Sequence, residues 1–171
     1  MRPEVALIWA QTPAGLIGAG GALPWHLPQD LARFRALTWG SAVVMGHATW
    51  LSLPRRYRPL PGRLNLVLSR SPSLALDGAE VVGGPEAALA AAARWPGSLW
   101  VIGGASVFEA FWPLAARAEV TVVDLDVGGD RLAPRLDGRW RLDCRDPAEG
   151  WRASPTGLRY RFETWRRRQS Q

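Results

Sequence analysis

Short apolar runs alternate with segments of helical character over most of the chain, and this alternation limits the possible folds more than any other feature of the sequence. Because a helix between two consecutive strands allows them to run parallel, the pattern predicts a mostly parallel central sheet with flanking helices. The strands are expected at residues 5–10, 42–45, 64–68, 80–82, 99–102 and 119–125. The helices are expected at residues 28–39, 49–53, 85–94 and 105–114.

The C-terminal part of the chain follows a different pattern. After Asp126 no helix is evident, and residues 140–143 and 158–165 are predicted to form strands joined by polar loops. Strands without a helix between them favour antiparallel pairing. The chain has 171 residues, a length that suits one domain. We therefore expect a single α/β domain over residues 1–171, with an antiparallel edge formed by its C-terminal strands.

The charge of the chain is unusual, because all 21 basic residues are arginines and they exceed the 15 acidic residues to give a net charge of +6. A basic protein suits nucleic acid or a small polyanionic ligand such as a nucleotide cofactor. The arginines at 166–168 are interpreted as a solvated tail. No apolar run approaches the ~18 residues of a membrane span, no signal pattern is evident, and Cys144 stands alone. A cytoplasmic protein without disulfides is expected.

Glycines gather where the predicted strands end. They occur at residues 15–21 after the first strand, at Gly46 after the second, and at Gly103 and Gly104 after a later one. Open parallel sheets bind ligands beyond the carboxyl ends of their strands. A glycine pair before a helix leaves backbone N–H groups accessible to an anion. The pair is shorter than a dinucleotide-binding fingerprint, so a tight turn explains it as readily as a binding loop does.

One carboxylate lies within a predicted apolar helix face. At about 100° per residue, Asp30 falls inside the arc formed by Leu27, Leu31, Phe34 and Leu37. A carboxylate on the core side of a helix is costly unless it is paired or has a task. It either turns out to solvent at the helix N-terminus, or it lies beneath an apolar pocket with a raised pKa. In the second case it binds a planar nitrogenous ligand or donates a proton.

Other catalytic arrangements find little support. His26 and His47 do not form a metal site with Cys144, and no Gly-x-Ser-x-Gly nucleophile motif occurs, so no metal is expected. Arg63 follows Leu60-Pro61-Gly62 at the start of a strand. It is either a surface cation or a clamp for a carboxylate.

Motifs in a fixed order and spacing cover nearly the whole chain, and together they resemble dihydrofolate reductase. Those of the N-terminal half lie at residues 16–18, 23–31, 44–50, 60–63 and 68–70, and those of the C-terminal half at 101–104 and 129–130. Residues 8–10 and 157–161 look like the actinobacterial branch of that family. The resemblance implies reduction of 7,8-dihydrofolate to 5,6,7,8-tetrahydrofolate with hydride from NADPH, a step of one-carbon metabolism. It also makes antifolate inhibitors plausible ligands.

The resemblance also implies roles for particular side chains. Asp30 would be the only ionisable group at the pterin, and Thr121 and Trp25 would complete the catalytic set. Arg63 would hold the α-carboxylate of the substrate's glutamate. The substrate pocket would further be lined by Ile8, Trp9, Leu31, Phe34, Leu53 and Ile102.

Cofactor contacts are implied mainly at the ends of the predicted strands. The loop at 17–23 would close over the nicotinamide, braced by residues 129–130, and Gly103-Gly104 is expected as a cis peptide. Because the family usually has Arg where His47 stands, Arg70 is expected to take over the 2′-phosphate. Other departures from the family pattern are Ala48, Ala105, Ser106 and Phe108. The full cofactor set is Ala10, Ile17, Gly18, Gly46, His47, Ala48, Thr49, Leu68, Ser69, Arg70, Gly83, Ile102, Gly103, Gly104, Ala105, Ser106, Val107 and Phe108.

Two other functions remain as alternatives. An NADPH-dependent pyrimidine reductase of riboflavin synthesis would not need the combination of Trp25, Asp30 and Arg63, which suits a pteroylglutamate. A basic RNA-binding module would need arginines and aromatic rings along one exposed face, whereas the tryptophans here lie in apolar segments. A monomer that binds neither nucleic acid nor membrane is expected.

Overall fold

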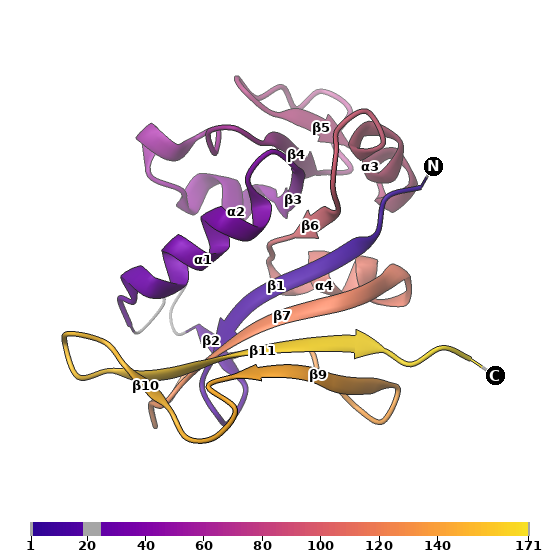
Figure 1. Ribbon diagram of the computed structural model, residues 1–171. Coiled ribbons are helices and arrows are strands. Elements are labelled where there is room, and N and C mark those ends of the chain that lie inside the picture. Colours follow the sequence, from indigo (N-terminus) through magenta and orange to yellow (C-terminus); the bar gives the residue numbers. More distant parts are fainter. Residues whose placement is uncertain (1, 19–24, 171) are drawn as a thin grey trace. The chain divides into compact units, whose positions relative to one another are not determined.

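The computed structural model describes residues 2–18 and 25–170, and its elements are drawn in Figure 1. The chain divides into two compact units. The first comprises Met1–Leu7 and Ala36–Ala115, and the second comprises Ile8–Arg35 and Ala116–Gln171. The expectation of one domain over the whole chain stays a prediction. Strand β1 (Val5–Gln11) contributes to both units.

The first unit holds the parallel part of the sheet. Its strands are ordered β1-β6-β3-β4-β5, and every pairing among them is parallel. Central β3 and β4 are almost wholly buried, as expected for apolar strands covered on both faces. The strands are β3 (Ala42–Gly46), β4 (Leu64–Leu68), β5 (Glu80–Val82) and β6 (Leu99–Val101). The helices are α2 (His47–Ser52), η1 (Arg55–Tyr57), α3 (Pro85–Ala92), α4 (Ala105–Phe111) and η2 (Trp112–Leu114).

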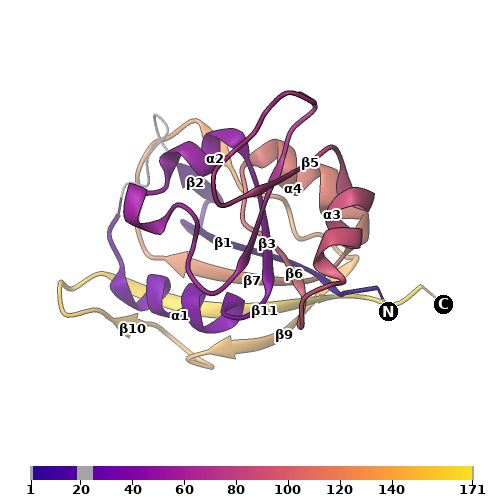
Figure 2. The ribbon, with the colours of Figure 1, turned by 90° about the horizontal axis from the view of Figure 1, so that it is seen from above.

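The second unit holds the antiparallel part. Strand β11 pairs antiparallel with β7, β9 and β10, and β2 pairs with β8 in a separate two-stranded sheet. Helix α1 (Pro28–Thr38) lies alongside β7 and β11, as Figure 2 shows. The strands are β2 (Leu16–Gly18), β7 (Ala115–Val123), β8 (Arg131–Leu132), β9 (Trp140–Asp146), β10 (Arg152–Ala153) and β11 (Arg159–Arg167).

The predicted fold class is confirmed: a mostly parallel sheet has flanking helices and an antiparallel C-terminal edge. Three strands were not expected, namely β2, β8 and β10, because two or three residues are too few for an alternating pattern. The strand expected at 119–125 begins earlier, at Ala115, and ends at Val123. Within the described ranges no helix has the length and apolar character to cross a membrane.

Two interpretations of side chains were wrong. In α1 only Thr38 is buried and Leu31 is 57% exposed, so the predicted apolar arc does not form a core face. Within α1, Asp30 and Arg33 meet β7 through hydrogen bonds with Thr121 and Glu119, and the buried member of the arc is Leu27, just before the helix.

The arginines at 166–168 do not form a solvated tail. Arg166 and Arg167 belong to β11, and the guanidinium of Arg167 lies 4.7 Å from the ring centroid of Trp140. The backbone N–H of Arg168 donates a hydrogen bond to the carbonyl of Arg139, at 2.7 Å. A long arginine stem packs on apolar neighbours while its charged end stays near water, so a run of arginines is compatible with a strand.

Candidate active site

The start of α1 is fixed by an apolar anchor. Leu27, which is 3% exposed, packs with Val123 and Tyr160. Pro28 opens the helix, a position that suits its fixed φ and missing N–H. The backbone N–H of Asp30 donates to the carbonyl of Leu27, at 3.0 Å. The anchor therefore sets where the first turn of α1 lies on the second unit.

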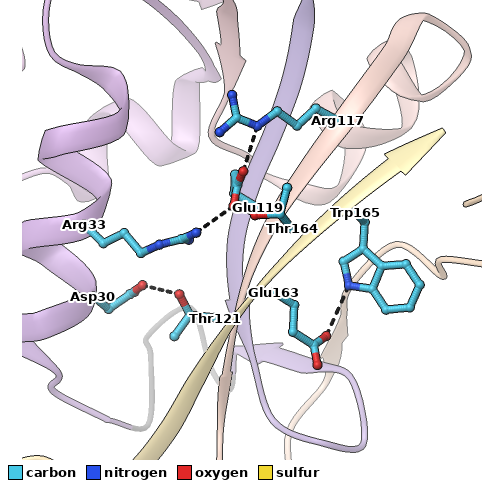
Figure 3. Close-up of polar contacts among 8 residues, drawn as sticks. All are labelled: Asp30, Arg33, Arg117, Glu119, Thr121, Glu163, Thr164 and Trp165. Carbon is cyan, nitrogen blue, oxygen red and sulfur yellow. Dashed lines mark hydrogen bonds and ion pairs between the residues drawn. The ribbon is translucent and has the colours of Figure 1, made fainter. Parts of the chain in front are cut away.

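Asp30 faces β7 from this first turn. The Thr121 hydroxyl donates a hydrogen bond of 2.5 Å to Oδ1 of Asp30 (Figure 3). Thr121 itself is 2% exposed. The predicted contact between these two residues is confirmed, and Asp30 does not turn out to solvent.

The surroundings of Asp30 act on its pKa in opposite directions. Burial raises the pKa, while the hydrogen bond from Thr121 and the positive charge of Arg33 lower it, and the net direction is upward. Burial prevails because water no longer solvates the ionised carboxylate. A carboxyl group with a raised pKa retains its proton closer to neutral pH, as a general acid requires.

A second buried carboxylate lies on the same face of β7. Glu119 is 1% exposed and accepts three hydrogen bonds of 2.7 Å, from Arg33, Arg117 and the Thr164 hydroxyl (Figure 3). A buried charge with three donors is well compensated. Sequence reasoning missed this group. The available signal was a lone acid two positions before Thr121, since residues two apart share a face of a strand.

The other predicted substrate residues of the second unit lie on β1 and α1. Ile8 and Ala10 are half-buried, whereas Trp9 is 7% exposed and donates from its indole to Gln11, at 2.8 Å. Alternate residues of a strand point to opposite faces, so Trp9 faces away from Ile8 and Ala10. Phe34 is half-buried on α1.

Trp25 packs against the cluster of Leu27, Val123 and Tyr160, where it is half-buried. Its predicted role in catalysis stays a prediction.

The loop predicted to close over the nicotinamide falls mostly on residues outside the described ranges. Its first residues, Ile17 and Gly18, lie in β2, which pairs with β8 directly after Asp130. The carbonyl of Gly15 accepts a hydrogen bond from the N–H of Ala133, at 2.7 Å. Residues 131–133, next to Gly129 and Asp130, therefore contact residues 15–18, and the brace by Gly129 and Asp130 themselves stays a prediction.

In the first unit, predicted cofactor residues lie at the carboxyl ends of four neighbouring parallel strands. The N–H of Gly46, after β3, donates to the carbonyl of Gly103, after β6, at 2.8 Å. The N–H of Ser69, after β4, donates to the carbonyl of Val82 in β5, at 2.9 Å. These bonds bring together the strand ends where such sheets bind ligands. Leu68, Arg70, Gly83 and Ile102 also lie at these ends.

The glycine pair after β6 has the predicted cis peptide bond. Gly103 has a φ of +117°, a conformation that side chains rarely adopt. A Cβ atom on either glycine would lie 3.9 Å from the Thr49 hydroxyl. Helix α4 follows and carries the predicted Ala105, Ser106, Val107 and Phe108.

The α4 side chains pack closely beneath these strand ends. A Cβ on Gly46 would lie 3.2 Å from Val107, and Phe108 is 3% exposed beside Gly103. His47 and Ala48 form the first turn of α2. Glycine at 46 therefore permits a close approach between β3 and α4.

The side chain of Arg63 is held by its own loop and by residues at the end of α1. Its Nε donates to the carbonyl of Pro61 at 2.9 Å, one terminal nitrogen donates to the Thr38 hydroxyl at 3.1 Å, and its guanidinium lies 5.7 Å from the ring centroid of Trp39. Gly62 has a φ of +71°, and a Cβ there would lie 2.5 Å from the Trp39 ring. The guanidinium is thus oriented rather than loose on the surface.

The buried side chain of Asn65 holds the same loop through hydrogen bonds to its backbone. Its side-chain amide donates to the carbonyls of Leu60 and Arg63, both at 3.0 Å, and its oxygen accepts from the N–H of Leu60 at 2.9 Å.

The predicted site residues are divided between the two units. Leu53, Arg63 and the residues at the strand ends belong to the first unit, and Asp30 and its neighbours belong to the second. Among the described residues, no three His, Cys, Asp or Glu side chains gather to hold a metal ion.

Comparisons with known proteins agree on one family. The family model described as dihydrofolate reductase matches residues 4–167. Dihydrofolate reductases of Mycobacterium tuberculosis and Mycobacterium leprae are 49% and 46% identical over 166 residues, covering 95% of this chain and 98% of each relative. That of Neisseria meningitidis serogroup B is 42% identical over 160 residues, which is 93% of this chain and 95% of the relative.

A solved structure gives the same result. The dihydrofolate reductase from Enterococcus faecalis, complexed with NADP(H) and RAB-propyl, has a TM-score of 0.84 and 31% identity, and the match covers 97% of each chain. The predicted resemblance is confirmed, including its actinobacterial character, which the mycobacterial relatives share. By sequence motifs, fold and relatives alike, the chain belongs to the dihydrofolate reductase family.

Proposed function

We propose that Asp30 anchors the pterin and handles the proton when this chain reduces 7,8-dihydrofolate to 5,6,7,8-tetrahydrofolate. NADPH-dependent reduction of dihydrofolate is the activity of the family, and it fits this chain. The observation that supports the role of Asp30 is its environment in the second unit, next to Thr121. There a half-buried carboxyl with a raised pKa accepts the Thr121 hydrogen bond at 2.5 Å.

Asp30 and Thr121 divide the work at the pterin. The hydroxyl of Thr121 fixes one carboxylate oxygen and leaves the other to accept from N–H groups of a planar ring. A carboxyl with a raised pKa keeps its proton to a higher pH than an ordinary carboxyl, and can deliver it to a ring nitrogen, directly or through water. Bound NADPH supplies the hydride.

The donor chemistry of the first unit fits a dinucleotide. The hydroxyls of Thr49 and Ser69 and the guanidinium of Arg70 lie at the ends of neighbouring parallel strands. A Cβ on Gly83 would meet no atom within 4 Å, so there is space beside these ends. We infer that Arg70, which is exposed, pairs with the cofactor's 2′-phosphate.

Arg63 is proposed to bind the α-carboxylate of the substrate's glutamate. The contacts with Pro61, Thr38 and Trp39 hold its planar fork in one orientation. A planar guanidinium held in this way can pair with a carboxylate through two parallel hydrogen bonds.

Asp30→Asn tests the proposal, because it keeps the side-chain volume and removes the ionisable group. We expect dihydrofolate-dependent NADPH oxidation at pH 7 to fall by about 10²–10⁴-fold, the usual range for general acid–base catalysis. Asp137→Asn, at an exposed aspartate paired with Arg139, is the matched control and retains normal activity. Near-normal turnover of Asp30→Asn at pH 7 would refute the role of Asp30.

The monomeric state, the cytoplasmic location and the binding of antifolate inhibitors stay predictions. Light scattering of the purified chain measures its mass directly, and competition by a diaminopyrimidine in the activity assay tests inhibitor binding.

A further inference from the structure

We propose that Glu119 acts on Asp30 through Arg33: it pairs with the guanidinium that lies beside the Asp30 carboxyl and partly neutralises its positive charge. The inference rests on the proposed role of Asp30 and adds to it a second carboxylate that touches no substrate. It concerns only residues of the second unit.

Two polar contacts between α1 and β7 lie side by side. Asp30 and Arg33 are three residues apart on the helix and so share a face, and Glu119 and Thr121 are two apart on the strand and so share a face. Thr121 bonds Asp30 at 2.5 Å, and Glu119 bonds Arg33 at 2.7 Å (Figure 3). The pair on β7 therefore matches the pair on α1, residue for residue.

Strand β11 completes the setting of Arg33. In the antiparallel register Phe162 lies opposite Thr121, and Thr164 lies opposite Glu119. The guanidinium of Arg33 lies 4.5 Å from the ring centroid of Phe162, while the Thr164 hydroxyl donates to Glu119 at 2.7 Å. An aromatic face and a carboxylate thus hold the cation on two sides. These two contacts restrict the Arg33 guanidinium more than an exposed ion pair would.

The charges around Asp30 alternate in sign. Arg33 comes from α1, and Glu119 and Arg117 come from β7. On β11, Phe162 and Thr164 are uncharged, and Arg166 lies opposite Arg117. Glu119 partly neutralises the positive charge that Arg33 presents to Asp30. Loss of the Glu119 charge then favours the ionised form of Asp30, and loss of the Arg33 charge favours the protonated form.

These opposite signs separate an electrostatic role from a structural one. Either substitution loosens the contact between α1 and β7, and a change caused by loosening has the same sign in both variants. Only an electrostatic link shifts the protonation of Asp30 downward in one variant and upward in the other.

The test measures single-turnover hydride transfer, followed by NADPH absorbance, as a function of pH in the full-length chain. The rate of a reaction that needs a protonated acid falls as pH rises through a midpoint. We expect Glu119→Gln to lower this midpoint and Arg33→Met to raise it, each by about 0.5–1 pH units. Arg33→Lys keeps the charge and returns the midpoint to the wild-type value.

Glu163→Gln is the matched control. Glu163 is also a buried glutamate, 6% exposed, and it accepts hydrogen bonds from Trp165 (Figure 3) and from Arg161. It lies between Phe162 and Thr164 in sequence and so on the opposite face of β11. It is expected to leave the midpoint unchanged.

Opposite shifts with rescue by Arg33→Lys support the proposal, and any other pattern overturns it. If Glu119→Gln fails to fold, the comparison of Arg33→Met with Arg33→Lys decides alone: a raised midpoint that lysine does not restore, or no shift, overturns the proposal. Asp30→Asn distinguishes the two levels, because normal activity of that variant refutes the role of Asp30 itself. If Asp30→Asn is impaired but the Arg33 and Glu119 variants show no shift, only the electrostatic role of Glu119 is refuted.

Discussion

Thr121→Val isolates the hydrogen bond to the proposed catalytic carboxyl. The substitution keeps the β-branched shape on β7 and removes only the hydroxyl that donates to Asp30 at 2.5 Å. Because this bond lowers the pKa of Asp30, its loss adds to the effect of burial and raises the pKa further. The acid therefore stays protonated to higher pH in the variant.

The size of the effect follows from the charge on the acceptor. A hydrogen bond to a charged group contributes about 1.5–3 kcal/mol, and about 1.4 kcal/mol corresponds to one pH unit. The protonated acid loses part of the same bond, so we expect the midpoint to rise by about one pH unit. The buried carboxyl also loses a partner, which lowers the free energy of unfolding at pH 7 by about 1–3 kcal/mol.

The assay is single-turnover hydride transfer from pH 5 to 9, with thermal unfolding measured on the same samples. Thr156→Val is the control, since it removes a hydroxyl that bonds Ser154 but keeps every charge and the Asp30 bond in place. Its midpoint is expected to remain at the wild-type value. A Thr121→Val midpoint that is unchanged, or that moves to lower pH, refutes the reasoning.

Three further outcomes are expected. Arg63→Ala raises KM for dihydrofolate more than it lowers kcat, since an ion pair present in both ground and transition states is lost; an unchanged KM places the glutamate site elsewhere. Arg70→Ala weakens NADPH by about 10- to 150-fold and NADH hardly at all in fluorescence titrations, and equal losses show that Arg70 does not contact the 2′-phosphate. Asp30→Asn raises Tm at pH 7, because burial raises the pKa of Asp30 and the ionised carboxylate therefore disfavours the folded state. The gain disappears in acid below the ordinary carboxyl pKa, and a pH-independent difference contradicts it.

The elements with strong patterns were predictable from the sequence. The strands at 64–68 and 80–82 have the expected bounds. Apolar residues flanked by turn residues indicate both that a strand forms and where it begins and ends. The short β2 and β8 could not be predicted, since they form only by pairing with each other across a long stretch of chain.

The candidate site was predictable where a single residue carries an unusual chemistry. Asp30 stood out as an acid among apolar neighbours, and its partner Thr121 followed from the family resemblance. Arg33 and Glu119 did not stand out, because arginines are frequent in this chain and the pairing depends on how α1 lies along β7. The apolar arc was wrong for the same reason, since periodicity does not show which side of a helix is covered.

The contact between Gly62 and Trp39 couples the evolution of two positions. A side chain at 62 would need the space of the indole ring, and the φ of Gly62 disfavours any side chain there. Displacing Trp39 would in turn remove the aromatic face beside Arg63. In a saturation library, replacements of Gly62 should therefore be depleted under selection for folate reduction. A smaller residue at position 39 should restore them only in part, because the strain at φ +71° remains and the ring beside Arg63 is lost.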